Sequence, residues 1–307
     1  MSARAGPMAP DHAAVVELPG PVALAATLWP LAHGTGDPTI RFTADGVWRA
    51  TRLRSGAATL CLRQLEADRI AVDAWGPGAG EAIETAGELA GALDRPDGLV
   101  PRHPALEDAV RRNPGLRLPR SRRLLEALLP AILEQKVTGV EARRAYRALI
   151  HRHGERAPGP PGLWLQPAAA TLAGLPSYAW HPLGVERRRA EVIRAAARLA
   201  PRIEAAETPV VADLVLRSVA GIGPWTSAEV RRVALGDPDA ISVGDFHVPS
   251  LVAWALAGEA RADDARMLEL LEPYRGQRGR VQRLLEASGI RPPRFGPRMA
   301  PRNIATL

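Results

Sequence analysis

Residues 216–250 read LRSVAGIGPWTSAEVRRVALGDPDAISVGDFHVPS, and this stretch carries most of the structural information in the chain. Its apolar spacing predicts two helices, over 211–219 and 225–235, joined by the short connection AGIG. Gly221 and Gly223 permit a tight turn and leave no side chain over the backbone. The amides of this turn then point outward at a helix N-terminus. Such an end suits a phosphate oxygen and reads the nucleic-acid backbone rather than its sequence.

An aspartate follows the second helix. The chain passes through an apolar run to Gly244 and Asp245, just before a helix expected over 248–257. Aspartate is a favoured helix N-cap, so Asp245 by itself indicates no more than a cap. Its position after a hairpin that binds the DNA backbone is more informative about function. A hairpin that only binds phosphate does not need a carboxylate at that position.

Hairpin and aspartate together resemble the helix-hairpin-helix DNA glycosylases. The family hairpin has the form LxGxGxxTA; here it runs from Val219 to Ser227, and Asp245 falls at the family's aspartate. The branch that the chain resembles is 3-methyladenine DNA glycosylase II, which excises alkylated bases. Further matches extend over most of the chain, namely NPGLRLP at 113–119, ILEQKVT at 132–138, RAE at 189–191 and EPYR at 272–275.

The rest of the sequence predicts a mostly α-helical protein with an N-terminal α+β domain. Several β-rich runs lie between residues 39 and 75, and Asp45-Gly46 between two of them is a β-hairpin signal. The resemblance implies a glycosylase architecture with a cleft between helical subdomains. The predicted divisions are a flexible tail at 1–19, the α+β domain at 20–98, the helical region at 99–290 with its hairpin at about 211–235, and a flexible tail at 291–307.

The resemblance implies a hydrolase that removes alkylated purines, such as 3-methyladenine, from duplex DNA and so initiates base excision repair. The target base must be flipped out of the duplex. Its departure leaves positive charge on the sugar, which Asp245 is expected to stabilise while it orients water. Trp225 is the expected stacking partner of the cationic base, and Phe246 a further wall. Glu229 lies one turn after Trp225, at a position where the alkylated-base branch has an aromatic residue. Three roles are open for its carboxylate: it attracts a cationic base, it forms a hydrogen bond with a neutral base, or it points to solvent.

The same resemblance assigns DNA contacts to two segments. The hairpin contributes Gly221, Gly223 and Thr226, and the loop after the first long helix contributes Gln135, Lys136 and Thr138. Lys136 stands where this branch inserts an apolar wedge into the duplex. Because an ammonium fills a vacated base stack poorly, Lys136 is an alternative phosphate ligand.

The sequence departs from the lyase-type and iron–sulfur relatives. Lyases carry a nucleophilic lysine just after the hairpin, where this chain has Pro224-Trp225-Thr226, so we expect no lyase activity. The single cysteine excludes an iron–sulfur cluster. No cofactor is required, although the resemblance implies a structural monovalent cation held by the backbone carbonyls of Arg217, Val219 and Ile222.

Composition agrees with a nucleic-acid partner. The 307 residues include 40 Lys+Arg against 33 Asp+Glu, a formal net charge of +7, although Arg-rich usage also reflects a GC-rich genome. No apolar run approaches the ~20 residues of a membrane span. The N-terminus lacks the apolar core of a secretory signal. We therefore expect a cytoplasmic, nucleoid-associated monomer that binds damaged double-stranded DNA and no membrane.

Two other functions stay open. One alternative is a glycosylase that removes oxidised or mismatched bases. Assays with a panel of damaged bases would distinguish it from an enzyme that removes alkylated bases. The other alternative is a non-catalytic helix-hairpin-helix DNA-binding protein. Asp245 argues against it, because a protein that only binds phosphate does not need an aspartate at that distance from the hairpin.

Overall fold

The computed structural model describes residues 8–293, so residues 1–7 and 294–307 of the two predicted tails lie outside the described part. The N-terminal half contains a five-stranded antiparallel sheet with the strand order β1-β5-β4-β3-β2. The predicted hairpin is confirmed, since Thr43 pairs with Gly46 across a turn made by Ala44 and Asp45. The strands are β1 (His12–Glu17), β2 (Ile40–Thr43), β3 (Gly46–Arg52), β4 (Ala57–Glu66) and β5 (Arg69–Trp75).

Strand β1 contradicts the predicted flexible tail of residues 1–19 where the strand lies, at His12–Glu17. It pairs with β5 along the sheet edge, from His12 opposite Ala74 to Glu17 opposite Arg69. Most of its side chains are exposed. Backbone hydrogen bonds therefore hold this strand in place, and the sequence lacks the apolar alternation that marks a half-buried strand.

Two short helices complete the N-terminal core. Helix α2 (Ala79–Leu89) lies across the sheet, and α1 (Leu24–Leu28) packs into the same cluster of buried side chains. The apolar faces of β3, β4 and β5 supply most of the rest of this core.

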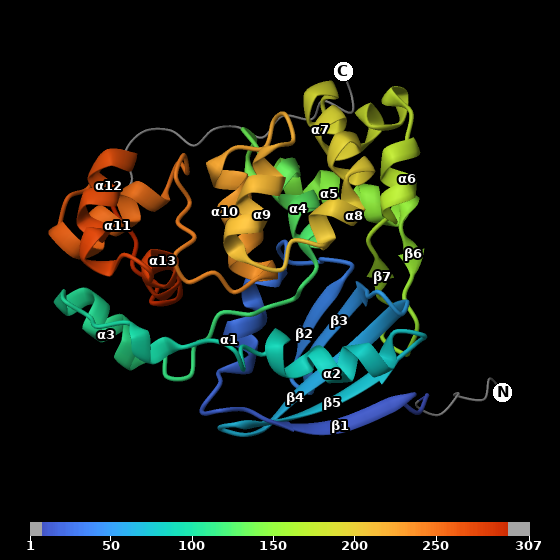
Figure 1. Ribbon diagram of the computed structural model, residues 1–307, viewed down its shortest axis with the longest axis horizontal. Coiled ribbons are helices and arrows are strands. Elements are labelled where there is room, and N and C mark those ends of the chain that lie inside the picture. The colour runs from blue at the N-terminus through green and yellow to red at the C-terminus, as the bar shows by residue number, and fades with distance from the viewer. Residues whose placement is uncertain (1–7, 294–307) are drawn as a thin grey trace.

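The helical region forms two groups of helices (Figure 1), and each group has its own apolar core. One unites α3 (Pro104–Arg112) with α11 (Val248–Ala257), α12 (Asp264–Leu271) and α13 (Arg278–Ala287). The other is built by α4 (Leu124–Leu133), α5 (Gly139–His153), α6 (Ala169–Gly174), α7 (Arg187–Arg198), α8 (Ala200–Glu204), α9 (Pro209–Arg217) and α10 (Pro224–Ala234). The segment 235–247 joins α10 of the second core to α11 of the first. Two further short strands, β6 (Glu155–Arg156) and β7 (Trp164–Leu165), pair with each other.

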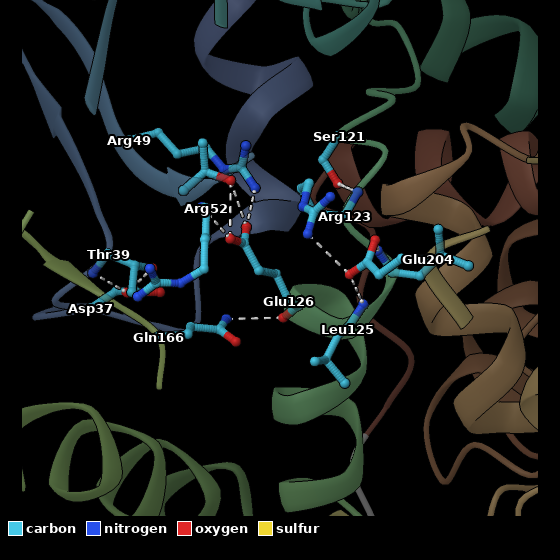
Figure 2. Close-up of polar contacts among 12 residues, drawn as sticks. Asp37, Thr39, Arg49, Arg52, Ser121, Arg123, Leu125, Glu126, Gln166 and Glu204 are labelled. Carbon is cyan, nitrogen blue, oxygen red and sulfur yellow. Dashed lines mark hydrogen bonds and ion pairs between the residues drawn. The ribbon is translucent and has the colours of Figure 1, made fainter. Parts of the chain in front are cut away.

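Helix α4 is held by polar groups from outside the helix. Its first turn has no local side-chain cap, and Glu204 of α8 accepts from the Leu124 and Leu125 amides at 3.3 and 3.0 Å (Figure 2). Further along, Pro130 removes the amide that the Glu126 carbonyl would otherwise bond. Gln166 Nε2 donates to that carbonyl instead, at 2.9 Å. The helix thus stays continuous through the proline.

The Glu126 carboxylate fastens α4 to the sheet. It accepts from Arg49 Nη2 at 2.9 Å, from the Thr51 hydroxyl at 2.8 Å and from the Arg52 amide at 2.7 Å (Figure 2). The Arg49 side chain is only 9% exposed, so its charge depends on this partner. Since both ends of these bonds are fixed, α4 holds its C-terminal loop at a defined place.

We expect Glu126→Ala to destabilise the fold by about 3–5 kcal/mol, because it leaves the buried guanidinium of Arg49 without its carboxylate partner. Denaturant unfolding measures the change. The matched control is Glu155→Ala, since Glu155 is 57% exposed and pairs with Arg52 at 3.0 Å. That surface pair should contribute less than about 1 kcal/mol. Equal effects of the two substitutions would contradict the structural role given to Glu126.

Candidate active site

The predicted hairpin forms between α9 and α10. Gly221 has a φ of +94°, and a Cβ there would lie 2.4 Å from Val192 Cγ2, so this position requires glycine. Gly223 has a φ of −99°, caps α10, and has no atom within 4 Å of a built Cβ. No side chain caps this helix. Because the first-turn amides of Trp225 and Thr226 have no partner within the helix, they are donors for an external oxygen.

Gln135 anchors the hairpin to the end of α4. Its Nε2 donates to the Gly221 carbonyl at 3.0 Å and to the Thr226 hydroxyl at 2.8 Å. Thr226 is only 2% exposed. The Thr226 side chain thus receives the Gln135 amide, and the DNA contact expected of Thr226 is left to its backbone amide. The sequence motifs did not indicate that the end of α4 and the hairpin are hydrogen-bonded to each other.

Asp213 ties the two hairpin helices together. The Ser227 hydroxyl of α10 donates to Asp213 Oδ1 of α9 at 2.7 Å. Arg217 lies 3.3 Å from the same carboxylate, and Arg231 3.7 Å from it. These contacts make the turn between the helices rigid.

Asp245 lies in the segment that connects the two helical cores. Its Oδ1 accepts from the His247 and Val248 amides at 2.6 and 2.9 Å, so it does cap the start of α11. Its Oδ2 accepts from the indole Nε1 of Trp225 at 3.0 Å. The structure therefore brings together the two residues that the sequence analysis placed at the centre of the site. Three donors fix the orientation of this carboxylate beside the hairpin.

Two other expected pocket residues lie differently. Phe246 is 88% exposed, and its ring contacts only His247 among the aromatic side chains described, at 5.0 Å between centroids. The Glu229 carboxylate accepts from Arg232 Nη1 at 3.0 Å and from the Ser242 hydroxyl. Arg232 also donates to Glu286 at 2.8 Å. Although burial works against its charge, the carboxylates of Glu286 and Glu229 raise the pKa of Arg232. Glu229 thus links α10 to the segment that carries Asp245.

The loop between α4 and α5 presents Lys136. This residue is exposed and has a φ of +55°, a left-handed conformation that is costly for a residue with a side chain. Thr138 caps α5 in a capping box with Glu141: each side chain accepts from the other residue's amide, at 3.3 and 2.8 Å. The cap fixes the end of the loop and so the position of Lys136.

Comparisons with known proteins give a consistent fold. No protein-family model matches the chain, and no curated protein matches it. Among solved structures, a 3-methyladenine DNA-glycosylase from Archaeoglobus fulgidus aligns with a TM-score of 0.72 at 20% identity, over 89% of this chain and 97% of that one. The apo 8-oxoguanine glycosylase/lyase of Clostridium acetobutylicum aligns with 0.67 at 12% identity, over 90% and 96%. The chain has the fold of DNA glycosylases. The predicted fold class is confirmed.

Mag1, a 3-methyladenine DNA glycosylase of Schizosaccharomyces pombe solved with abasic DNA, shares this glycosylase fold. It aligns with a TM-score of 0.52 at 15% identity, over 64% of this chain and 97% of that one. The alignment with Mag1 therefore covers less of this chain than the alignment with the Archaeoglobus fulgidus protein, which covers 89% of it.

On this glycosylase fold the structure adds one site residue that the sequence analysis missed. Glu134 is the residue that ends α4, directly before Gln135, and its Oε1 lies 3.9 Å from His33 Nδ1. Burial raises the pKa of Glu134 to about 7, and the charges of Glu229 and Asp245 add to this increase while Arg143 opposes it. A glutamate beside the hairpin-binding Gln135 was the only signal in the sequence.

Residues 8–293 contain no group of three or more His, Cys, Asp or Glu side chains arranged to hold a metal ion. They also contain no helix that is long and apolar enough to cross a membrane. At the hairpin, the Val219 carbonyl accepts the Ile222 amide at 3.0 Å, which leaves this oxygen one further lone pair.

Proposed function

We propose that the protein is a monofunctional DNA glycosylase that excises alkylated purines, such as 3-methyladenine, from duplex DNA. The observation that supports this most strongly is the hydrogen bond between Trp225 and Asp245, directly beside the uncapped hairpin helix. The alignment with two 3-methyladenine DNA glycosylases also supports it. Just after the hairpin, where lyase-type relatives carry their lysine, this chain has Pro224-Trp225-Thr226.

In the proposed reaction the hairpin holds the DNA and Asp245 acts on the sugar. The first-turn amides of α10 bind a backbone phosphate. The half-buried indole of Trp225 stacks on the flipped cationic base. As the base leaves, positive charge develops at C1′, and the fixed carboxylate of Asp245 stabilises it. The water that then adds to C1′ loses its proton towards the same carboxylate.

Further partners of this proposal act on the DNA backbone. Lys136, held at the exposed tip of its loop, contacts a phosphate or enters the space that the flipped base vacates. A monovalent cation on the carbonyls of Arg217, Val219 and Ile222 would add positive charge beneath the same phosphate. Damaged double-stranded DNA is the proposed partner, bound by a monomer.

The expected product is an intact abasic site without strand cleavage, because no lysine follows the hairpin. A duplex with one methylated purine is incubated with the protein, with and without borohydride. We expect alkali-labile sites and no covalent enzyme–DNA adduct. An adduct that disappears in Lys136→Gln would overturn the monofunctional assignment and would make Lys136 a nucleophile.

A glycosylase for oxidised purines is the second candidate, favoured by the alignment with the 8-oxoguanine glycosylase/lyase at a TM-score of 0.67. Duplexes with a single 8-oxoguanine or a single methylated purine separate the two functions. Excision of the oxidised base alone would favour this second candidate.

A further inference from the structure

A loop of the N-terminal domain lies against helix α5. The loop, residues 33–37, precedes β2 and reads HGTGD. Its two glycines, Gly34 and Gly36, have φ values of +85° and +80°, which favour glycine at both positions. The buried Asp37 carboxylate accepts from the His33 amide at 2.7 Å and so closes the loop. The loop therefore has a fixed shape.

Each of the two glycines receives one arginine of α5. A Cβ built on Gly34 would lie 2.0 Å from Arg143 Cδ, so the Arg143 side chain passes directly over a bare glycine. A Cβ built on Gly36 would lie 3.9 Å from Arg147 Nη1. The same Nη1 donates to the Thr35 carbonyl at 3.1 Å. Because the two arginines are four residues apart, they lie on the same face of the helix.

Neutral groups, rather than carboxylates, hold these two guanidinium groups in place. In the described part of the chain neither Arg143 nor Arg147 forms an ion pair, although Arg143 interacts with the charge of Glu134 at longer range. Both arginines are only half-buried, so water and a ligand can reach them. The exposed Lys136 and Arg144 likewise form no ion pair within the described residues. These positive charges are therefore not neutralised by direct contact with a carboxylate.

The two arginines also lie near the hairpin. A Cβ built on Gly139, the first residue of α5, would lie 2.9 Å from Arg143 Nη1, so this guanidinium reaches the start of the helix. Gln135, four residues before Gly139, bonds the hairpin at Gly221. Four residues of chain span at most about 14 Å, whereas one turn of duplex DNA is about 34 Å long. A single turn of duplex can therefore contact both the hairpin and Arg143.

We propose that Arg143 and Arg147, held by the 33–37 loop of the N-terminal domain, form a second phosphate-binding site for the same DNA duplex. This inference rests on the DNA binding of the proposed function and assigns part of it to the N-terminal domain. A guanidinium presents a planar fork of N–H donors that matches two phosphate oxygens. Because the loop already orients both side chains, less conformational entropy is lost when a phosphate binds. The contact involves the DNA backbone and is independent of the damaged base.

The test measures how DNA affinity depends on salt. A short undamaged duplex, and the same duplex with one abasic site, are titrated with protein by fluorescence anisotropy between about 0.1 and 1 M salt. For both duplexes, the double variant Arg143→Gln, Arg147→Gln should reduce the steepness of log affinity against log salt by about 1.8, or about 0.9 for each lost phosphate contact. Affinity should fall by about 10–100-fold at about 0.1 M salt and hardly change near about 1 M.

Two control variants separate the effect of charge from an effect on structure. The double variant Arg143→Lys, Arg147→Lys keeps both charges and should keep the wild-type salt dependence, whereas a purely structural role of the guanidinium groups would be lost in it as well. The double variant Arg111→Gln, Arg112→Gln removes the same number of charges from α3, which lies apart from α5 (Figure 1). Both of these arginines pair with Asp108. This control should also keep the wild-type salt dependence.

Thermal unfolding of each variant distinguishes a folding defect from a binding defect. If the double glutamine variant does not fold, Arg143→Gln alone is measured in its place. The Arg143 guanidinium makes no hydrogen bond within the described residues, so this single substitution should leave the fold intact. Its salt dependence should become less steep by about 0.9.

The failures of the two proposals are distinguishable. If a folded glutamine variant keeps the wild-type salt dependence, or if the lysine variant loses as much affinity as the glutamine variant, the second phosphate site is overturned and the glycosylase function stands. An equal effect in the α3 control overturns it likewise, because net charge alone then explains the result. If the wild type releases no methylated purine but the salt dependence changes as expected, the proposed function fails and the phosphate site stands.

Discussion

Asp245→Asn is expected to lower base excision by about three orders of magnitude or more, which is about 4 kcal/mol of transition-state stabilisation. The substitution keeps the size of the side chain and removes the charge that faces the developing cation on the sugar. DNA affinity should persist or rise slightly, since a carboxylate near phosphates repels them. Single-turnover excision of a methylated purine, measured beside DNA affinity, gives both values.

The contacts of Asp245 also predict how much stability the Asp245→Asn variant should lose. The asparagine carbonyl can still accept from the His247 and Val248 amides, so the cap on α11 is kept. Its amide group would then face the indole N–H of Trp225, and the loss of that bond should cost about 1 kcal/mol.

Trp225→Phe is the matched control for the lost bond, because it removes the same hydrogen bond and keeps both the carboxylate and an aromatic ring. We expect this variant to lose similar stability but to retain far more excision than Asp245→Asn. Near-wild-type excision by Asp245→Asn would reduce Asp245 to a helix cap and remove most of the case for an enzyme.

Gly223→Val is expected to weaken DNA binding by about 10–100-fold, the effect of losing a charge-assisted hydrogen bond worth about 1.5–3 kcal/mol. The added side chain would stand over the first-turn amides of α10, where a phosphate has to approach. Its backbone φ of −99° is open to valine and no atom lies within 4 Å of the new Cβ, so the fold should persist. Fluorescence anisotropy with an abasic-site duplex at fixed salt measures the change.

Two other glycines serve as controls for this substitution. Gly174 at the end of α6 also has no atom within 4 Å of a built Cβ, and Gly174→Val should leave DNA affinity unchanged. Gly221→Val should instead lose stability, because that position has a φ of +94° and lies against Val192. A folded Gly223→Val protein with wild-type affinity would contradict the hairpin's contact with phosphate.

Local sequence signals predicted the hairpin and its helices well. Helix α11 spans Val248–Ala257 as expected, and α10 begins at Pro224, one residue before the predicted start. These features depend on turn glycines, a proline at a helix start and apolar spacing, all of which act over a few residues. The proximity of Trp225 and Asp245 was inferred only through the family resemblance.

Features that depend on long-range contacts could not be predicted in the same way. Strand β1 is held by pairing with β5, far along the chain, and its side chains carry no periodic signal. The bond from Gln135 to Gly221 and the one from Gln166 to the Glu126 carbonyl likewise join distant segments. The raised pKa of Glu134 arises first from burial and then from charged groups on three other parts of the fold. Such properties follow from tertiary packing, which residue spacing does not encode.

Release of free base from methylated DNA is the most direct measurement of the proposed activity. Duplex DNA treated with a methylating agent is incubated with the purified protein, and the liberated bases are separated by chromatography. We expect free 3-methyladenine to accumulate with time and with protein concentration, while the DNA strands stay unbroken until alkali is added. DNA that is bound by the protein but keeps all of its methylated bases would contradict the proposed activity.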